Sequence, residues 1–187
     1  MRLRESIFHI LPALWLMASQ PAFATIMREL SLDDLSQQSS LIIEGTCTGL
    51  RTSWQQGALM TEASFAVGDT FRGRSQETVR VLVAGGVDTS SSPAVAMQVV
   101  GAPTFYPGEH VLLFLRPLPA PDDAYAVVGL SQGKFTLNTT NDGSLVAERD
   151  LGGIELEGGP DHGGDSAQPL PLRRLISELH RIAAAQK

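Results

Sequence analysis

The chain has 187 residues, a formal net charge of −6 at neutral pH and one cysteine, Cys47. The negative balance disfavours nucleic acids and anionic membrane surfaces as partners, because both repel an acidic protein. One cysteine cannot form an internal disulfide, so a fold of this length must depend on an apolar core of its own. We expect Cys47 to be a small buried residue of that core, with a reactive or intermolecular thiol as the alternative.

The first 24 residues have the pattern of an export signal. Two arginines precede an apolar run over residues 7–17, and small residues follow the run up to Ala24. The run is too short to cross a membrane, which takes about 20 apolar residues. We therefore expect cleavage between Ala24 and Thr25 and a periplasmic or secreted product without a membrane-spanning segment. That product would have 163 residues (187 − 24) and a net charge of −7, because the signal carries two basic residues and one acidic residue.

Turn signals divide the next part of the chain into one helix and three strands. Residues 31–34 have the form of a capping box, which predicts a short helix that ends near residue 40. Residues 41–52, 59–71 and 78–83 have the composition and alternation of antiparallel strands. Gly49 is a candidate bulge within the first strand.

A glycine- and serine-rich segment follows over residues 84–93. Its composition would suit a phosphate cradle, but such cradles need a helix directly after them. Residues 94–100 have a strand pattern instead, so we expect a mobile surface loop at 84–93.

The most apolar stretch after the signal is the run of residues 111–115, which predicts a strand buried on both faces. Residues 125–130, 134–137 and 144–149 add three more strands. Together these elements predict a mainly β protein, an antiparallel OB-like barrel of roughly six to eight strands within residues 25–150.

The C-terminal part is expected to contain a linker and a helix. Residues 151–170 are rich in glycine and acidic residues, which is typical of a solvated linker. Pro171 then opens an amphipathic helix over residues 171–187. Its apolar stripe is expected to pack on the barrel, with docking of a partner as the alternative. The stripe consists of Leu172, Leu175, Ile176, Leu179, Ile182 and Ala183.

The sequence contains no recognisable catalytic or metal-binding constellation. His110, His162 and His180 lack the spacing of a zinc site. Residues 129–133 match the letters G-x-S-x-G around Ser131, but a nucleophile elbow needs a helix after the serine, and a strand is expected here. We therefore expect a protein that is not an enzyme and that needs no metal or cofactor. A hydrolase that uses Ser131, or a metal near His110, is the alternative.

Three aromatic residues are expected to be exposed on loops. Trp54 lies at the tip of the first hairpin, and Phe105 and Tyr106 precede a Pro-Gly turn. Loop aromatics serve as binding anchors, or they cap the open end of a barrel. We predict that these three residues bind a partner, which would make the chain an exported, non-enzymatic binding module for a protein or another macromolecule.

Five motifs occur in order along residues 30–137. They are Leu32-x-x-Leu35, Leu41 to Thr46, Val67 to Gly73, Gly101-x-Pro103-x-Phe105-x-x-Gly108-Glu109-x-Val111 to Leu115, and Gly129-Leu130-x-Gln132-Gly133-Lys134-Phe135. With these motifs the chain resembles a group of poorly characterised secreted bacterial proteins. This resemblance implies export and a β-barrel, and some such proteins accompany secreted metalloproteases.

The layout also resembles the netrin-like barrel of the tissue inhibitors of metalloproteinases. That resemblance implies a second function, an inhibitor or chaperone of a secreted metalloprotease. Those inhibitors chelate zinc with an N-terminal cysteine and contain several disulfides. With Cys47 as its one cysteine, this chain departs from that pattern.

Overall fold

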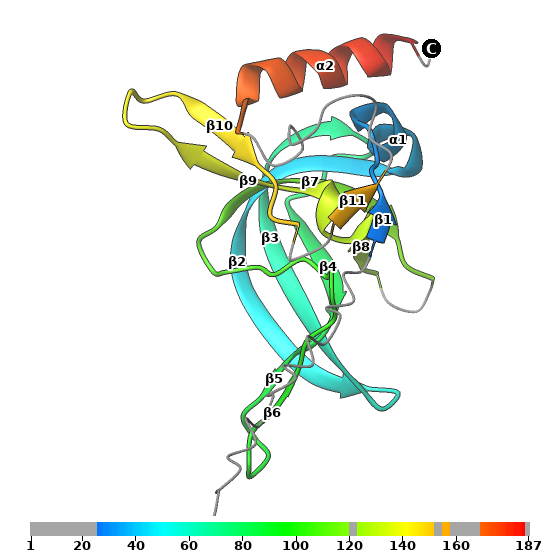
Figure 1. Cartoon of the computed structure of the whole chain (residues 1–187), viewed down its shortest axis with the longest axis vertical. Helices are drawn as coiled ribbons and strands as arrows, with labels where there is room; N and C mark the ends of the chain where they lie inside the picture. Colours follow the sequence, from blue (N-terminus) through cyan, green and yellow to red (C-terminus); the bar gives the residue numbers. More distant parts are fainter. Residues whose placement is uncertain (1–25, 120–122, 152–154, 158–168, 186–187) are drawn as a thin grey trace, which may run out of the picture.

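The computed structural model describes residues 26–119, 123–151, 155–157 and 169–185 (Figure 1). The described chain is mainly β, with a short helix near its beginning and a longer helix at its end. The predicted fold class is therefore confirmed. The expected signal peptide and its cleavage site lie outside the described residues.

Most strands belong to one eight-stranded sheet with the order β12-β10-β9-β7-β2-β3-β4-β8. Its strands are β2 (Leu41–Gln55), β3 (Ala58–Arg72), β4 (Thr78–Ala84), β7 (His110–Pro117), β8 (Tyr125–Val127), β9 (Lys134–Thr139), β10 (Leu145–Glu148) and β12 (Leu170–Pro171). Two smaller pairs are β1 (Ile26–Arg28) with β11 (Glu155–Glu157), and β5 (Gly86–Asp88) with β6 (Val95–Met97). The helices are α1 (Leu32–Gln38), the 3₁₀ turn η1 (Leu130–Gly133) and α2 (Leu172–Ala185).

Five strands of the large sheet close into a ring. β7 pairs with β2 on one side and with β8 on the other, and β8 pairs with β4. The path β2-β3-β4-β8-β7 therefore returns to its start. All these pairings are antiparallel except β4–β8, which is parallel and rests on the pair Val81–Tyr125. The result is a barrel-like ring, in agreement with the sequence prediction.

The long β2–β3 hairpin projects beyond this ring (Figure 1). Its two-residue turn consists of Gln56 and Gly57, both with positive φ (49° and 83°), which is the conformation that matches the twist of a hairpin. The register shifts between Cys47 and Gly49, so the predicted bulge is confirmed. The hairpin gives the ring an open end with long walls.

Two cores share the strands β2 and β7. Because neighbouring residues of a strand point to opposite faces, the apolar run of β7 supplies both cores. Val111, Leu113 and Leu115 lie inside the ring, whereas Leu112 and Phe114 lie in a second core beneath the helices. All five are completely buried, so this strand is buried on both faces as predicted.

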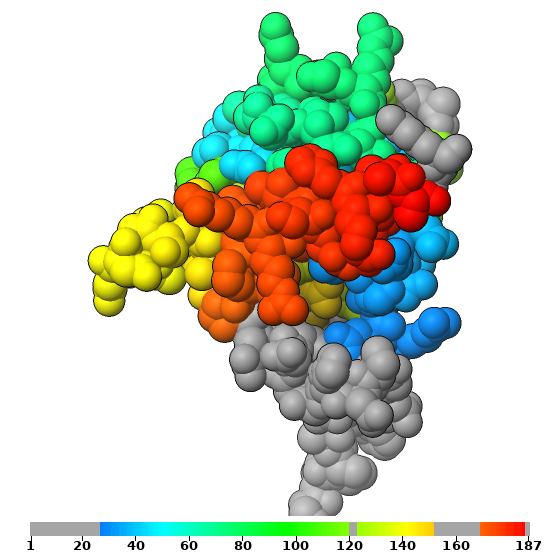
Figure 2. Space-filling model, turned by 90° about the horizontal axis from the view of Figure 1, so that it is seen from above, coloured from blue at the N-terminus to red at the C-terminus, as the bar shows by residue number. Residues whose placement is uncertain are grey.

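The two helices cover the second core. At the start of α1, Ser31 Oγ accepts a hydrogen bond from Asp34 N at 3.1 Å, and Asp34 Oδ2 accepts one from Ser31 N at 3.1 Å, so the predicted capping box is present. α2 lies across the molecule with the β9–β10 hairpin projecting beside it (Figure 2). Its stripe packs on this chain's own core, where four side chains are buried: Leu172, Leu175, Leu179 and Ile182.

Three sequence expectations require correction. The segment 84–93, expected to be a loop, contains β5, and the strand expected at 94–100 is limited to β6. The strand expected at 125–130 ends at Val127 because η1 follows it. The linker expected over residues 151–170 stays a prediction, because most of it lies outside the described residues; its described residues 155–157 form β11, which pairs in parallel with β1. No helix in the described part of the chain combines the length and the apolar character that a membrane span requires.

Candidate binding pocket

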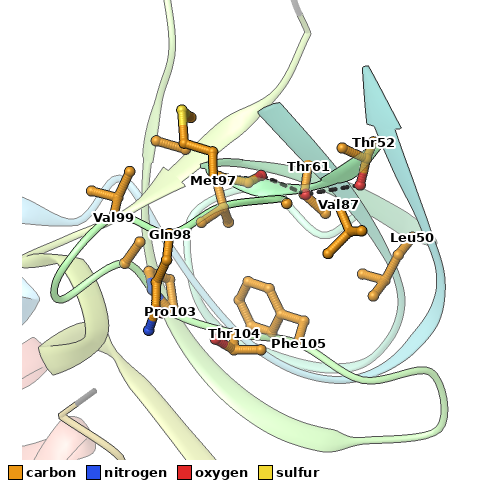
Figure 3. Close-up of a pocket in the computed structure, with 15 residues that line it drawn as sticks. Leu50, Thr52, Thr61, Val87, Met97, Gln98, Val99, Pro103, Thr104 and Phe105 are labelled. Atoms are coloured by element: carbon orange, nitrogen blue, oxygen red, sulfur yellow. Dashed lines mark hydrogen bonds between the residues drawn. The ribbon is translucent and has the colours of Figure 1, made fainter. Parts of the chain in front are cut away.

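A pocket of about 360 Å³ lies at the open end of the ring (Figure 3). The β2–β3 hairpin and the start of β5 form one side, and the segment from Met97 to Phe105 forms the other. This volume is at the lower end of the range of small-molecule pockets, roughly 300–1,000 Å³. Its principal lining side chains are Leu50, Thr52, Thr61, Val83, Val87, Met97, Val99, Pro103 and Phe105.

The pocket wall is mostly apolar, and two of its hydroxyl groups, those of Thr52 and Thr61, are engaged in hydrogen bonds within the fold. Thr52 Oγ1 and Thr61 Oγ1 are 3.1 Å apart, and Thr61 Oγ1 donates to the carbonyl oxygen of Gly85 at 2.7 Å. Figure 3 shows these threonines on the side opposite Phe105. The wall therefore suits an apolar group more than a charged one.

Phe105 contributes to the pocket from the inside of the fold. Its side chain is only 5 % exposed and packs edge-on against Phe65, with the ring centroids 5.0 Å apart. The expectation of an exposed loop aromatic is thus wrong for Phe105, because the loop before β7 folds inward onto the ring core. Its ring nevertheless lines the pocket.

A buried ion pair holds that loop in place. Lys134 Nζ lies 2.6 Å from Glu109 Oε1, donates to the carbonyl oxygen of Thr104 at 2.5 Å and stands 4.9 Å from the centroid of the Phe105 ring. Thr136 Oγ1 also donates to Glu109 Oε1 at 2.9 Å. Lys134 therefore positions the pocket wall, although sequence reasoning did not select it. The available signal was a lysine and a threonine on one face of a strand whose other face carries Phe135 and Leu137.

At the rim, Trp54 connects the β2–β3 hairpin to β5. Its side chain is 52 % exposed, and its indole Nε1 donates to Asp88 Oδ2 at 2.8 Å. Asp88 also accepts bonds from Ser90 Oγ at 2.6 Å, Ser91 Oγ at 2.7 Å and Ser90 N at 2.8 Å. The bonds from Ser90, Trp54 and Ser91 hold the pKa of Asp88 well below its usual range. The ionised carboxylate thereby fixes β5 over the pocket.

Exposed apolar side chains surround the pocket entrance. Leu50 is 41 % exposed, Val87 55 % and Val99 36 %, and all three line the pocket. Tyr106 is 64 % exposed but lies outside the pocket lining, and its backbone N–H donates to Glu109 Oε2. The structure thus brings Phe105 into the pocket lining. Trp54 and Tyr106 both lie outside that lining, but Trp54 bonds to β5, whose residues Gly86 and Val87 line the pocket.

The candidate catalytic groups lie elsewhere. Ser131 is 1 % exposed in the η1 turn, and its hydroxyl has no hydrogen-bond partner in the described chain. His110 Nε2 lies 2.9 Å from Glu44 Oε1. Cys47 is buried, as expected, and burial raises the pKa of its thiol. Among the residues that the structure describes, no three His, Cys, Asp or Glu side chains converge as a metal site would require.

The fold and the pocket define a mainly β protein whose barrel-like ring is open to an apolar cavity at one end. No protein-family model and no curated protein matches the chain. Its function is therefore inferred from the pocket and from the residues around it.

Proposed function

We propose that this protein is an exported, non-enzymatic binding module that takes an apolar side chain of another exported protein into the pocket. The observation that supports this most directly is the continuity between the pocket and its exposed apolar rim. Apolar surface contributes about 25 cal/mol per Å² when it is removed from water, so a rim of this kind favours burial by a partner.

The position of the pocket supports the same proposal. OB-type barrels bind ligands on one face and on its flanking loops, and the expected OB-like layout would place such a surface where the pocket lies. The hydrolase alternative has less support, because a nucleophile must be accessible to substrate and hydrogen-bonded to a base. Ser131 is buried, and no base bonds to its hydroxyl in the described chain.

Site-specific crosslinking tests the proposal. A photo-crosslinking amino acid at Val99, on the rim, should trap the partner covalently in intact cells, and mass spectrometry then identifies it. Val87→Asp should lower the crosslinked yield about tenfold or more, because a buried carboxylate at the entrance opposes burial of an apolar group. Val87 is 55 % exposed, so the substitution leaves the fold intact.

Leu145 provides the matched control. It is 40 % exposed on β10, in the hairpin that projects on the far side of the sheet from the pocket strands. Leu145→Asp should leave the yield unchanged. Equal crosslinking by the Val87→Asp protein and the unsubstituted protein would refute the pocket as the binding site.

A further inference from the structure

The outer half of β2 has an unpaired edge beside the pocket. β7 pairs with β2 only up to Thr46, opposite His110, and the loop before β7 adds two bonds at Cys47: Cys47 N donates to the Glu109 carbonyl, and Gly108 N donates to the Cys47 carbonyl. From Gly49 to Gln55, the described residues provide β3 as the only strand partner of β2.

The register shows which main-chain groups face this edge. Gly85 N donates to the carbonyl oxygen of Leu59 at 2.8 Å, so the main chain of Leu59 points away from β2. Trp54 is the register partner of Leu59. In a non-hydrogen-bonded pair the main-chain N–H and C=O groups of both residues face outward, so those of Trp54 point away from β3. Hydrogen-bonding direction alternates along a strand, so Thr52 and Leu50 also present their N–H and C=O groups to the open edge.

The same residues connect the edge to the pocket. The side chains of Leu50 and Thr52 line the cavity, and that of Trp54 reaches Asp88 on β5. β5 covers the inner face of the hairpin and not its edge, since a Cβ added at Gly86 would meet the side chains of Thr61 and Thr52. Figure 1 shows this outer half of β2 at the margin of the molecule.

Charges on the opposite face of the hairpin specify the chemistry of a strand that would pair here. Arg51 is the register partner of Glu62, which forms an ion pair with Arg80 on β4 at 3.2 Å. Arg80 is the register partner of Ser64, so it lies diagonally across from Glu62. The row of charges from Arg80 through Glu62 to Arg51 alternates in sign across β4, β3 and β2. It ends at the open edge with an exposed Arg51, for which the described residues provide no ion-pair partner. The next position in the row favours a carboxylate, because opposite charges stabilise a cross-strand pair.

We infer that the edge of β2 from Leu50 to Trp54 binds an extended segment of the partner by strand addition, with an acidic residue opposite Arg51 and an apolar neighbour in the pocket. This inference rests on the proposed function and names the partner's binding element. Strand addition supplies affinity through main-chain hydrogen bonds and specificity through alternate side chains. A second copy of β2 cannot supply the acidic residue, since residues 49–55 contain neither Asp nor Glu.

A synthetic peptide tests the inference directly. The probe is a blocked heptapeptide in which valine alternates with threonine and one glutamate replaces the central threonine. When it binds, amide hydrogen exchange measured by NMR should slow at Leu50, Thr52 and Trp54. Exchange at Arg51 and Ser53 should stay unchanged, because these amides already face β3.

Charge reversal supplies the second measurement. Arg51→Glu should weaken binding of the glutamate peptide about tenfold and should favour the same peptide with lysine at its centre. Arg116→Glu is the matched control, because Arg116 is an exposed arginine on β7, a strand that ends its pairing with β2 before the open edge. It should leave both affinities unchanged.

Three outcomes would overturn strand addition. Shifts of the Leu50 and Val87 methyl signals without protection of the three amides would mean that only a side chain binds, and the proposed function would stand. Absence of any effect of the peptide would also reject strand addition, and crosslinking at Val99 then decides separately on the pocket. Protection of the three amides that depends on protein concentration, without peptide, would assign the edge to a second copy.

Discussion

At the scale of single residues, Asp88 determines the geometry of the pocket rim. Its carboxylate accepts bonds from Trp54, Ser90 and Ser91, and these bonds favour the ionised form. Because the folded-state pKa is lowered, the stabilisation by the carboxylate is complete above the unfolded pKa, about 3.9 for an aspartate. It is lost only as the pH falls through the lower, folded-state pKa.

The hydrogen bonds of Asp88 at the rim should therefore persist when the pH falls through the ordinary pKa range of an aspartate. We expect the Trp54 indole N–H signal to keep its position as the pH falls past about 4 and to move only at lower pH. Asp88→Asn, which keeps an acceptor but carries no charge, should abolish this movement. A titration of the indole signal centred near 4 in the unsubstituted protein would contradict the prediction.

At the scale of elements, the ion pair between Lys134 and Glu109 attaches the loop before β7 to β9. The two side chains are 7 % and 11 % exposed, so each carries its charge inside the fold. Removal of one partner leaves the other charge buried without compensation, which typically costs about 3–5 kcal/mol. The wall containing Thr104 and Phe105 depends on this attachment.

Substitution of Lys134 alone should accordingly lower the free energy of unfolding more than substitution of Lys134 and Glu109 together. We expect Lys134→Met to lower the free energy of unfolding by about 3–5 kcal/mol in urea denaturation. Lys134→Met combined with Glu109→Gln should recover part of that loss, because the glutamine remains a hydrogen-bonding group without a charge. Simple addition of the two single-substitution costs would show that the ion pair is not coupled.

At the scale of the whole molecule, the sequence predicted the structural features that depend on residues close together in the chain. The alternation in residues 59–71, the capping box at Ser31, the bulge at Gly49 and the stripe of α2 are all present. Each of these features depends on interactions between residues that are close together in the sequence, so the residue pattern alone predicts it. The same holds for the run 111–115, whose uniform apolarity reflects burial on two faces.

The features that the sequence could not predict depend on pairing between distant segments. Burial of Phe105 follows from Lys134 and Phe65, which lie far from it along the chain. Closure of the ring follows from the pairing of β7 with β8 and of β8 with β4. Trp54 bonds to Asp88, which lies 34 residues away in the sequence. The position of Trp54 at a hairpin tip therefore did not predict this hydrogen bond.

Because β2 and β7 contribute side chains to both cores, we expect the molecule to unfold as one cooperative unit. Substitutions on α2 test this expectation. Leu175 is completely buried in the second core, and Trp54 lies at the far end of the β2–β3 hairpin. Leu175→Ala should cost about 2–5 kcal/mol, whereas Arg174→Ala, at an exposed position of the same helix, should change stability by less than about 0.5 kcal/mol. Because β2 and β7 belong to both cores, Trp54 fluorescence and far-ultraviolet circular dichroism should give coincident urea transitions in both variants. An earlier loss of helical signal with Trp54 unchanged would show that the second core unfolds independently of the ring.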